Sequence, residues 1–346
     1  MLGALLTGLA LAAQPCGPKS QVPCCNPSTT PPQLCPGGIP CESCGSSSAC
    51  ECPSSPSPSP SPTPPKSDNR LTVVNGCHEP LWIAHIEGGG LGPDAQDVKI
   101  SPGGNSSFHT GLHGGGLSAT RFWPKLGCDA MGGNCSIGSS GGPAEACVIR
   151  VAGKPDDYSH CAPPVDTKFE ATFATQGSAA KDVLDMSLVD GYTLPFKLEV
   201  DGGSCERRTQ DFNGMDCSGL SMSRCPRSEV LGGKSLSLHA VNPKTGRPGG
   251  CYSPCMKLTD DKWNPNGTAV APDSAVAGPY CCAGAWGSPD ACNAGAVLGT
   301  QYLKAVKDMC AAAYGYAYDD KTATISCTTT TRYTVTFYCP AGAHSR

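Results

Sequence analysis

From Leu71 onward, short stretches of the chain are rich in Val, Thr, Phe and Tyr, and many of them alternate apolar with polar residues. Gly, Pro or Asn separates one stretch from the next. Alternation of this kind predicts half-buried β-strands. The clearest stretches are Leu71–Val74, Leu81–Ala84, Phe169–Phe173, Phe196–Val200 and Tyr333–Phe337. We therefore expect a mainly β domain, an antiparallel β-sandwich or barrel.

Two regions depart from this pattern. Between Gln301 and Tyr314 the apolar residues recur at helical spacing, which predicts one helix packed on the β core. These residues are Leu303, Val306, Met309, Cys310 and Ala313. From about 205 to 300, Cys and Gly dominate and strand-like stretches are scarce, so we expect a loop-rich lobe held by disulfides. A cleft between that lobe and the β core is the natural place for a ligand.

The first part of the chain divides into three segments. Residues 1–15 hold an apolar run that ends in small residues, as a secretory signal peptide does. Residues 16–52 form a small module with eight cysteines and few aliphatic residues, which only cross-links could order. Zinc at Cys41 and Cys44 is the less favoured alternative, because no second pair accompanies them. Residues 53–69 alternate Pro with Ser and Thr, which is typical of an extended linker before a domain at 70–340.

The composition indicates which cellular compartment and which classes of partner the protein has. The chain has 24 Cys, an even number, so disulfides and an oxidising, extracellular or cell-wall location are favoured. Glycosylation acceptors at Asn105, Asn134 and Asn266 are compatible with secretion. Only 16% of residues are charged and the net charge is −4, so we expect no nucleic-acid partner. No stretch is long enough to predict a transmembrane segment, and we expect a monomer without metal or cofactor.

The stretch from Asp185 to Pro195 places two carboxylates, Asp185 and Asp190, five residues apart on an otherwise apolar segment. Asp190-Gly191 is a turn signal and Pro195 is a breaker, so Asp190 should lie where a strand ends. Two other patterns are rejected. The pair His113–Gly116 and Gly138–Gly142 imitates an esterase but lacks the strand and helix context. His109 and His113 have metal-ligand spacing on a helix, which Gly111 argues against.

Sixteen cysteines follow the linker, and their number and order resemble those of the thaumatin-like family, whose domain has eight disulfides. Several motifs carry the resemblance over about 70–340. They are Asn75-Gly76-Cys77 before Leu81-Trp82, Arg121-Phe122-Trp123 before Gly127-Cys128, Ser187–Tyr192, Tyr280-Cys281-Cys282, Tyr316–Asp320 and Tyr333–Pro340.

The resemblance implies eight disulfides, because spacing alone cannot choose a pairing. The implied pairs are Cys77 with Cys339, Cys128 with Cys135, Cys147 with Cys161, Cys205 with Cys327, Cys217 with Cys310, Cys225 with Cys251, Cys255 with Cys281, and Cys282 with Cys292. The chain departs from the family at Ile137–Ser140, where the family usually has Thr-Gly-Asp-Cys. Ser140 then stands where a cysteine is expected, which leaves the bridge from Cys147 to Cys161 the least specified.

The resemblance also implies an acidic cleft formed by one Arg, one Glu and three Asp. The corresponding residues are Arg121, Glu170, Asp185, Asp190 and Asp319, with Asp320 as the alternative to Asp319. Clustered carboxylates raise the pKa of at least one member, which gives a site both an acid and a base. Glycoside hydrolysis needs such a pair, and we assign Glu170 as acid with Asp190 or Asp185 as its partner.

The implied partner of that cleft is a β-1,3-glucan-type polysaccharide. The expected function is glucan binding with a defence or antifungal role. Weak endo-β-1,3-glucanase activity and membrane perturbation without catalysis are the alternatives. A structural role, in which ion pairs hold the lobes together, also stays open.

Overall fold

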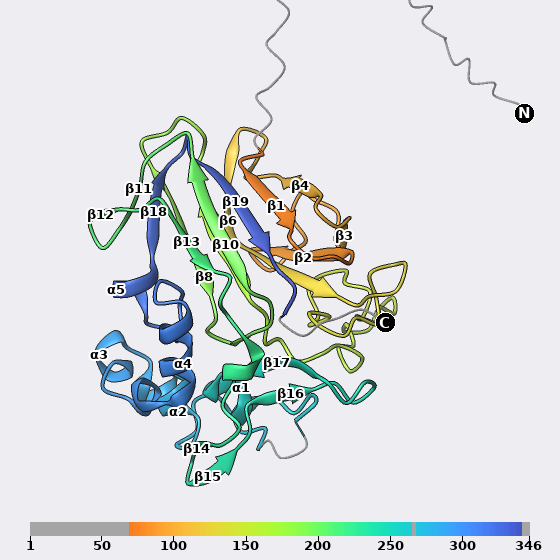
Figure 1. Ribbon diagram of the computed structural model, residues 1–346, viewed down its shortest axis with the longest axis vertical. Coiled ribbons are helices and arrows are strands. Elements are labelled where there is room, and N and C mark those ends of the chain that lie inside the picture. Colours follow the sequence, from red (N-terminus) through yellow and green to blue (C-terminus); the bar gives the residue numbers. More distant parts are fainter. Residues whose placement is uncertain (1–68, 265–267, 341–346) are drawn as a thin grey trace, which may run out of the picture. The chain divides into compact units, whose positions relative to one another are not determined.

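The computed structural model describes residues 69–264 and 268–340, and these form two packed sheets with a lobe of short helices and strands below them in Figure 1. The signal peptide at 1–15, the cysteine module at 16–52, most of the linker at 53–69 and the acceptor Asn266 lie outside the described residues. No helix in the described ranges is long and apolar enough to cross a bilayer.

The first sheet has five strands, and its order places the last strand of the chain beside the first. In sheet order the strands are β13 (Gly214–Cys217), β10 (Phe196–Asp201), β19 (Arg332–Phe337), β1 (Leu71–Asn75) and β4 (Asn105–Phe108). The β1 and β19 strands run parallel, with Leu71 opposite Tyr333. This differs from the all-antiparallel expectation, because an alternating pattern reveals which face is buried but not which strand is the neighbour.

The second sheet has nine strands and is antiparallel throughout. In order these are β12 (Gln210–Asp211), β11 (Cys205–Arg207), β18 (Ile325–Thr328), β8 (Lys181–Ser187), β7 (Lys168–Phe173), β6 (Gly115–Leu126), β2 (Leu81–Glu87) and β3 (Val98–Ile100), with β5 (Gly111–Leu112) paired to β6. The segment 205–217, expected in the lobe, extends the two sheets instead, and β11 lies opposite β18 with Cys205 facing Cys327.

An aromatic core joins the two sheets. Phe169 and Phe173 of β7 lie 6.2 and 5.9 Å, between ring centroids, from Tyr333 of β19. Phe108 of β4 meets Phe122 of β6 edge to face at 5.2 Å. All of these rings are buried, and burying a large apolar side chain contributes roughly 1.5–3 kcal/mol, so this contact helps to hold the two sheets together.

The lobe contains more regular structure than its sequence indicates. Its strands are β9 (Gly191–Tyr192), β14 (Glu229–Leu231), β15 (Lys234–Leu236), β16 (His239–Val241) and β17 (Pro248–Tyr252). Its helices are α1 (Pro254–Thr259), α2 (Gly278–Cys281), α3 (Pro289–Cys292), α4 (Gln301–Met309) and α5 (Asp320–Ala323). Apart from α4, these helices have at most six residues, too few to show a clear periodicity.

Helix α4 is the helix expected over 301–314, but it ends at Met309. Thr300 caps its start by accepting a hydrogen bond from the backbone of Leu303. Its end is set by tertiary structure, because the backbone of Tyr314 bonds to Met186 and Leu188 at the end of β8. A strand-like contact at Tyr314 is incompatible with another helical turn.

The sixteen cysteines of the domain form eight disulfides with the pairing that the resemblance implies, including Cys147 with Cys161. The bridge from Cys77 to Cys339 lies just beyond the ends of β1 and β19 and closes 262 residues of chain. It therefore fixes the parallel pair from which the five-stranded sheet is built.

Candidate functional site

Three of the expected site residues form one row across the nine-stranded sheet. Arg121 on β6 lies opposite Glu170 on β7, and Glu170 lies opposite Asp185 on β8. Their strand neighbours Phe122 and Phe169 point into the core, so the row itself lies on the outer face. We call Arg121, Glu170 and Asp185 the acidic row.

Within the acidic row, the guanidinium of Arg121 forms an ion pair with the carboxylate of Glu170. The Arg121 side chain is 54% exposed and that of Glu170 is 25% exposed, so both remain accessible. An exposed ion pair contributes little to stability, about 0–1 kcal/mol, and this pair is therefore free to exchange partners with a ligand.

Asp185 has a different environment from Glu170 although the two are neighbours. Its Oδ1 is buried and has no hydrogen-bond partner among the described residues. Burial raises the pKa of Asp185 well above its usual range, and the charges of Glu170 and Asp320 raise it further, while Arg121 opposes the shift. Asp185 therefore holds a proton at pH values where an ordinary carboxyl is ionised.

This asymmetry changes the roles expected of the two groups. The sequence led us to assign Glu170 as the proton donor, whereas the environments favour Asp185 as the proton-holding group. Two carboxyl groups in different environments are thus side by side on adjacent strands, Glu170 paired with Arg121 and Asp185 largely buried.

Asp190 lies beyond the end of β8 and just before β9, where the Asp-Gly turn predicts it. Its carboxylate forms an ion pair with the Lys168 ammonium, and its backbone oxygen accepts a hydrogen bond from Ser253 at 3.1 Å. Lys168 precedes Glu170 by two residues on the same face of β7. Asp190 is therefore connected to the acidic row through Lys168 and does not stand in the row itself.

Lys168 was not predicted as a site residue, although its place two residues before Glu170 is a signal that could have identified it. It is buried between carboxylates. Burial lowers the pKa of Lys168, but the charges of Asp190 and Asp166 outweigh burial and raise it. Asp166 is itself buried, and burial raises its pKa to about 6 against the charge of Lys168. Lys168 is thus a charged bridge between the interior and the site.

Asp319 and Asp320 are placed differently. Asp319 is only 2% exposed, and its carboxylate binds the Lys307 ammonium, the hydroxyl of Thr322 and the backbone of Gly315. Asp320 is exposed, accepts a hydrogen bond from the Tyr314 hydroxyl at 2.7 Å, and contributes to the raised pKa of Asp185. In this structure Asp320, the alternative residue, is the one that acts on the acidic row.

His78, Glu79 and Cys339 come close enough, within the described ranges, to suggest a metal site. The sulfur of Cys339 is bonded to Cys77, however, so it is not a thiolate ligand.

The chain is similar to known proteins over most of its length. A family model described as the thaumatin family matches residues 75–340. Thaumatin-like protein 1 of Pyrus pyrifolia is 32% identical over 276 residues, which cover 78% of this chain and 91% of that protein. Pathogenesis-related protein 5 of Arabidopsis thaliana is 29% identical over 273 residues, covering 78% and 90%.

Among solved structures, the thaumatin-like xylanase inhibitor TLXI matches with a TM-score of 0.32 at 15% identity. The match covers 77% of this chain and 97% of that one.

Proposed function

Because this chain belongs to the thaumatin family, we propose that it is a secreted defence protein that binds β-1,3-glucan-type polysaccharide at the acidic row. The names of relatives such as pathogenesis-related protein 5 support the defence role. The disulfides support an extracellular or cell-wall location, since such bonds persist in oxidising compartments.

The observation that carries the proposal is the alignment of Arg121, Glu170 and Asp185 across three adjacent strands. Guanidinium and carboxylate groups bind sugar hydroxyls as donors and acceptors, and positions on adjacent strands hold these groups at fixed spacing. Asp190, held by Lys168, and Asp320, held by Tyr314, supply further acceptors at the margins of the row.

Weak endo-β-1,3-glucanase activity is the second function, favoured by the raised pKa of Asp185 beside Glu170, which is paired with Arg121. Directly opposed residues on antiparallel strands have Cβ atoms roughly 4.5–5.5 Å apart. That proximity suits the short carboxyl separation of a retaining glycosidase better than the roughly 6.5–9.5 Å of an inverting one. In this scheme Asp185 protonates the leaving oxygen and Glu170 attacks the sugar.

Binding to insoluble β-1,3-glucan tests the first proposal. We expect retention of the wild-type protein and at least about tenfold weaker retention of Glu170→Gln and Asp185→Asn. The matched control is Glu199→Gln, an exposed carboxylate paired with Lys197 on the other sheet, which should bind as the wild type does. Equal retention of all four proteins would refute the proposed site.

A reducing-sugar assay on the same glucan separates the two functions. Sugar release that disappears in Asp185→Asn indicates the glucanase, and retention without release indicates binding alone. Leakage of glucan-free vesicles, with no retention on glucan, would instead favour membrane perturbation and contradict the proposal.

A further inference from the structure

Two hollows meet at Pro243 and Trp263, which line both. The smaller hollow has a volume of about 160 Å³ and the larger one about 870 Å³. Neither is lined by Arg121, Glu170 or Asp185, so both are distinct from the acidic row.

Trp263 adopts a backbone conformation that a bulky residue rarely takes, with φ at 53°. Hydrogen bonds of the two adjacent residues, Lys262 and Asn264, hold Trp263 in this backbone conformation. The backbone oxygen of Lys262 accepts a hydrogen bond from the Tyr252 hydroxyl, and its backbone nitrogen donates to Asp260 at 2.7 Å. On the other side, the Asn264 amide donates to the backbone oxygen of Asp260 at 2.7 Å. Strain that is held this firmly is characteristic of binding sites.

The indole of Trp263 is supported from behind by the backbone of β17. A methyl group at Gly249 would lie 2.7 Å from the ring carbon Cζ3 of Trp263, so only glycine permits this close packing. The rest of the half-buried ring lines the hollows. A cavity of about 150 Å³ accommodates a benzene-sized ring, so the smaller hollow has room for one six-membered ring against the indole.

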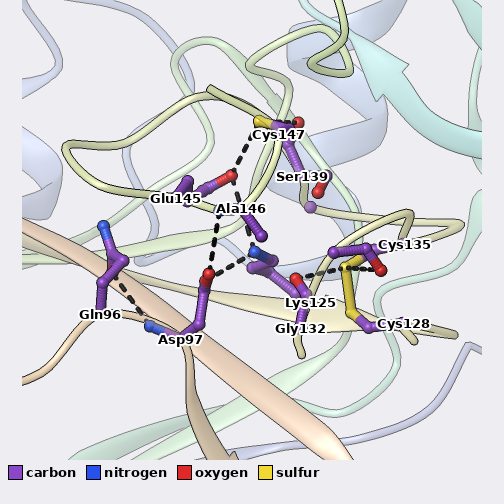
Figure 2. Close-up of polar contacts among 12 residues, drawn as sticks. Gln96, Asp97, Lys125, Cys128, Gly132, Cys135, Ser139, Glu145, Ala146 and Cys147 are labelled. Carbon is purple, nitrogen blue, oxygen red and sulfur yellow. Dashed lines mark hydrogen bonds and ion pairs between the residues drawn. A yellow bond between two sulfur atoms is a disulfide. The ribbon is translucent and has the colours of Figure 1, made fainter. Parts of the chain in front are cut away.

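The polar groups of the smaller hollow are cationic or neutral. Lys244 and His160 line it, and no Asp or Glu does. The Lys244 side chain is oriented by a hydrogen bond, which its ammonium donates to the Asn134 side-chain oxygen at 3.2 Å. The hydroxyl of Ser139, a residue only 4% exposed, has no hydrogen-bond partner among the described residues. Figure 2 shows Ser139 beside Cys147, with no contact drawn from the hydroxyl.

From these features we propose that the smaller hollow binds one hexuronate residue of an acidic polysaccharide. The apolar face of the sugar ring stacks on Trp263, and the carboxylate lies against Lys244 and His160. Adjacent sugar residues extend past Pro243 into the larger hollow, which is lined by Lys234 and Lys257 together with one carboxylate, Asp261. The protein then carries two sites of opposite charge preference.

Calorimetric titration with an oligogalacturonate and with a neutral oligosaccharide of equal length tests this proposal. Any N-linked glycan is removed first, since a glycan on Asn134 would stand at the hollow. We expect the uronate to bind at least about tenfold more tightly than the neutral sugar. Lys244→Gln should lose about tenfold in uronate affinity and keep its affinity for β-1,3-glucan.

Arg332→Gln, which removes an exposed cation on β19, is the matched control and should bind the uronate normally. Trp263→Ala should abolish uronate binding, but because Trp263 also packs on Gly249, the decisive variant is the exposed Lys244→Gln. Equal affinities for the acidic and neutral sugars, an equal loss in Arg332→Gln, or displacement by equimolar inorganic phosphate would each overturn the proposal.

Discussion

Glu170 and Asp185 face each other on adjacent antiparallel strands, yet one is paired with a guanidinium and the other has a buried oxygen without a partner. Two adjacent carboxyl groups thus have different environments. Burial raises the pKa of Asp185 well above its usual range, whereas the Glu170 side chain is 25% exposed and lies against Arg121.

Asp185→Asn should raise the stability of the domain at neutral pH while weakening glucan binding. The folded-state pKa of Asp185 lies above its unfolded value, so ionisation favours the unfolded state as the pH rises. Removing that ionisation should therefore raise the free energy of unfolding at pH 7. Urea unfolding at pH 7 measures the gain, and at pH 3, where the carboxyl is protonated in both states, wild type and variant should converge.

Glu145 and Asp166 should make the domain more stable at pH 5 than at pH 7.5. Burial raises the pKa of Glu145 from 4.5 to about 7 and that of Asp166 from 3.8 to about 6. The contribution of these two groups to the free energy of unfolding is therefore fully present below pH 4 and is lost as the pH rises to about 7. For Glu145 this contribution is on the order of 3 kcal/mol.

Glu145→Gln should flatten this pH profile. Figure 2 shows why the substitution is tolerable, since Lys125 keeps its ion pair with Asp97 at 2.6 Å. Thermal unfolding across pH 4–8 measures the profile. A profile of the variant as steep as that of the wild type would show that Glu145 does not titrate in this range.

Lys168→Met should destabilise the domain far more than Asp190→Asn. The first change removes the nearby positive charge that lowers the pKa of the buried Asp166 and takes the ion-pair partner from Asp190, and a buried polar group left uncompensated costs roughly 1–3 kcal/mol or more. The second removes a carboxylate whose side chain is 40% exposed, and the amide oxygen that replaces it can still accept from the Lys168 ammonium, so we expect a loss of about 1 kcal/mol or less. Guanidinium unfolding of both variants gives the order, and equal losses would contradict it.

Replacing both Cys77 and Cys339 by Ala should cost more than replacing both Cys128 and Cys135. The first bridge spans 262 residues and the second spans 7, so the first restricts the unfolded chain far more. Chain-entropy estimates give roughly 5 against 2 kcal/mol. Denaturant midpoints of the two double variants test the difference, and a larger loss from the short bridge would mean that local packing outweighs chain entropy.

Much of the β architecture is predictable from the chain, and the reasons are local. Residues such as Leu71, Phe169 and Tyr333 alternate with polar neighbours, which reveals strands without any knowledge of their partners. The order of strands is not local. Nothing in the stretch around Leu71 indicates a parallel neighbour more than 250 residues away, and nothing before Tyr314 indicates that it ends α4 by bonding to β8.

The acidic row was predictable as a set of residues but not as a geometry. Arg121, Glu170 and Asp185 could be chosen by resemblance, yet their alignment depends on the register of three strands. The relation of Asp319 to Asp320 depends on which way two adjacent residues face at the start of α5. Trp263 escaped prediction because its positive φ is imposed by distant partners such as Tyr252.

The parallel pairing of β1 with β19 also determines when the five-stranded sheet can form during synthesis of the chain. Since β19 lies between β1 and β10, the growing polypeptide lacks the middle of its five-stranded sheet until ribosomes have translated the segment ending at Phe337. Until then β1 keeps one unsatisfied edge, and Cys77 must remain reduced or be held by a temporary bond. Native oxidation of Cys77, the first cysteine of this domain, is thus a late event in folding.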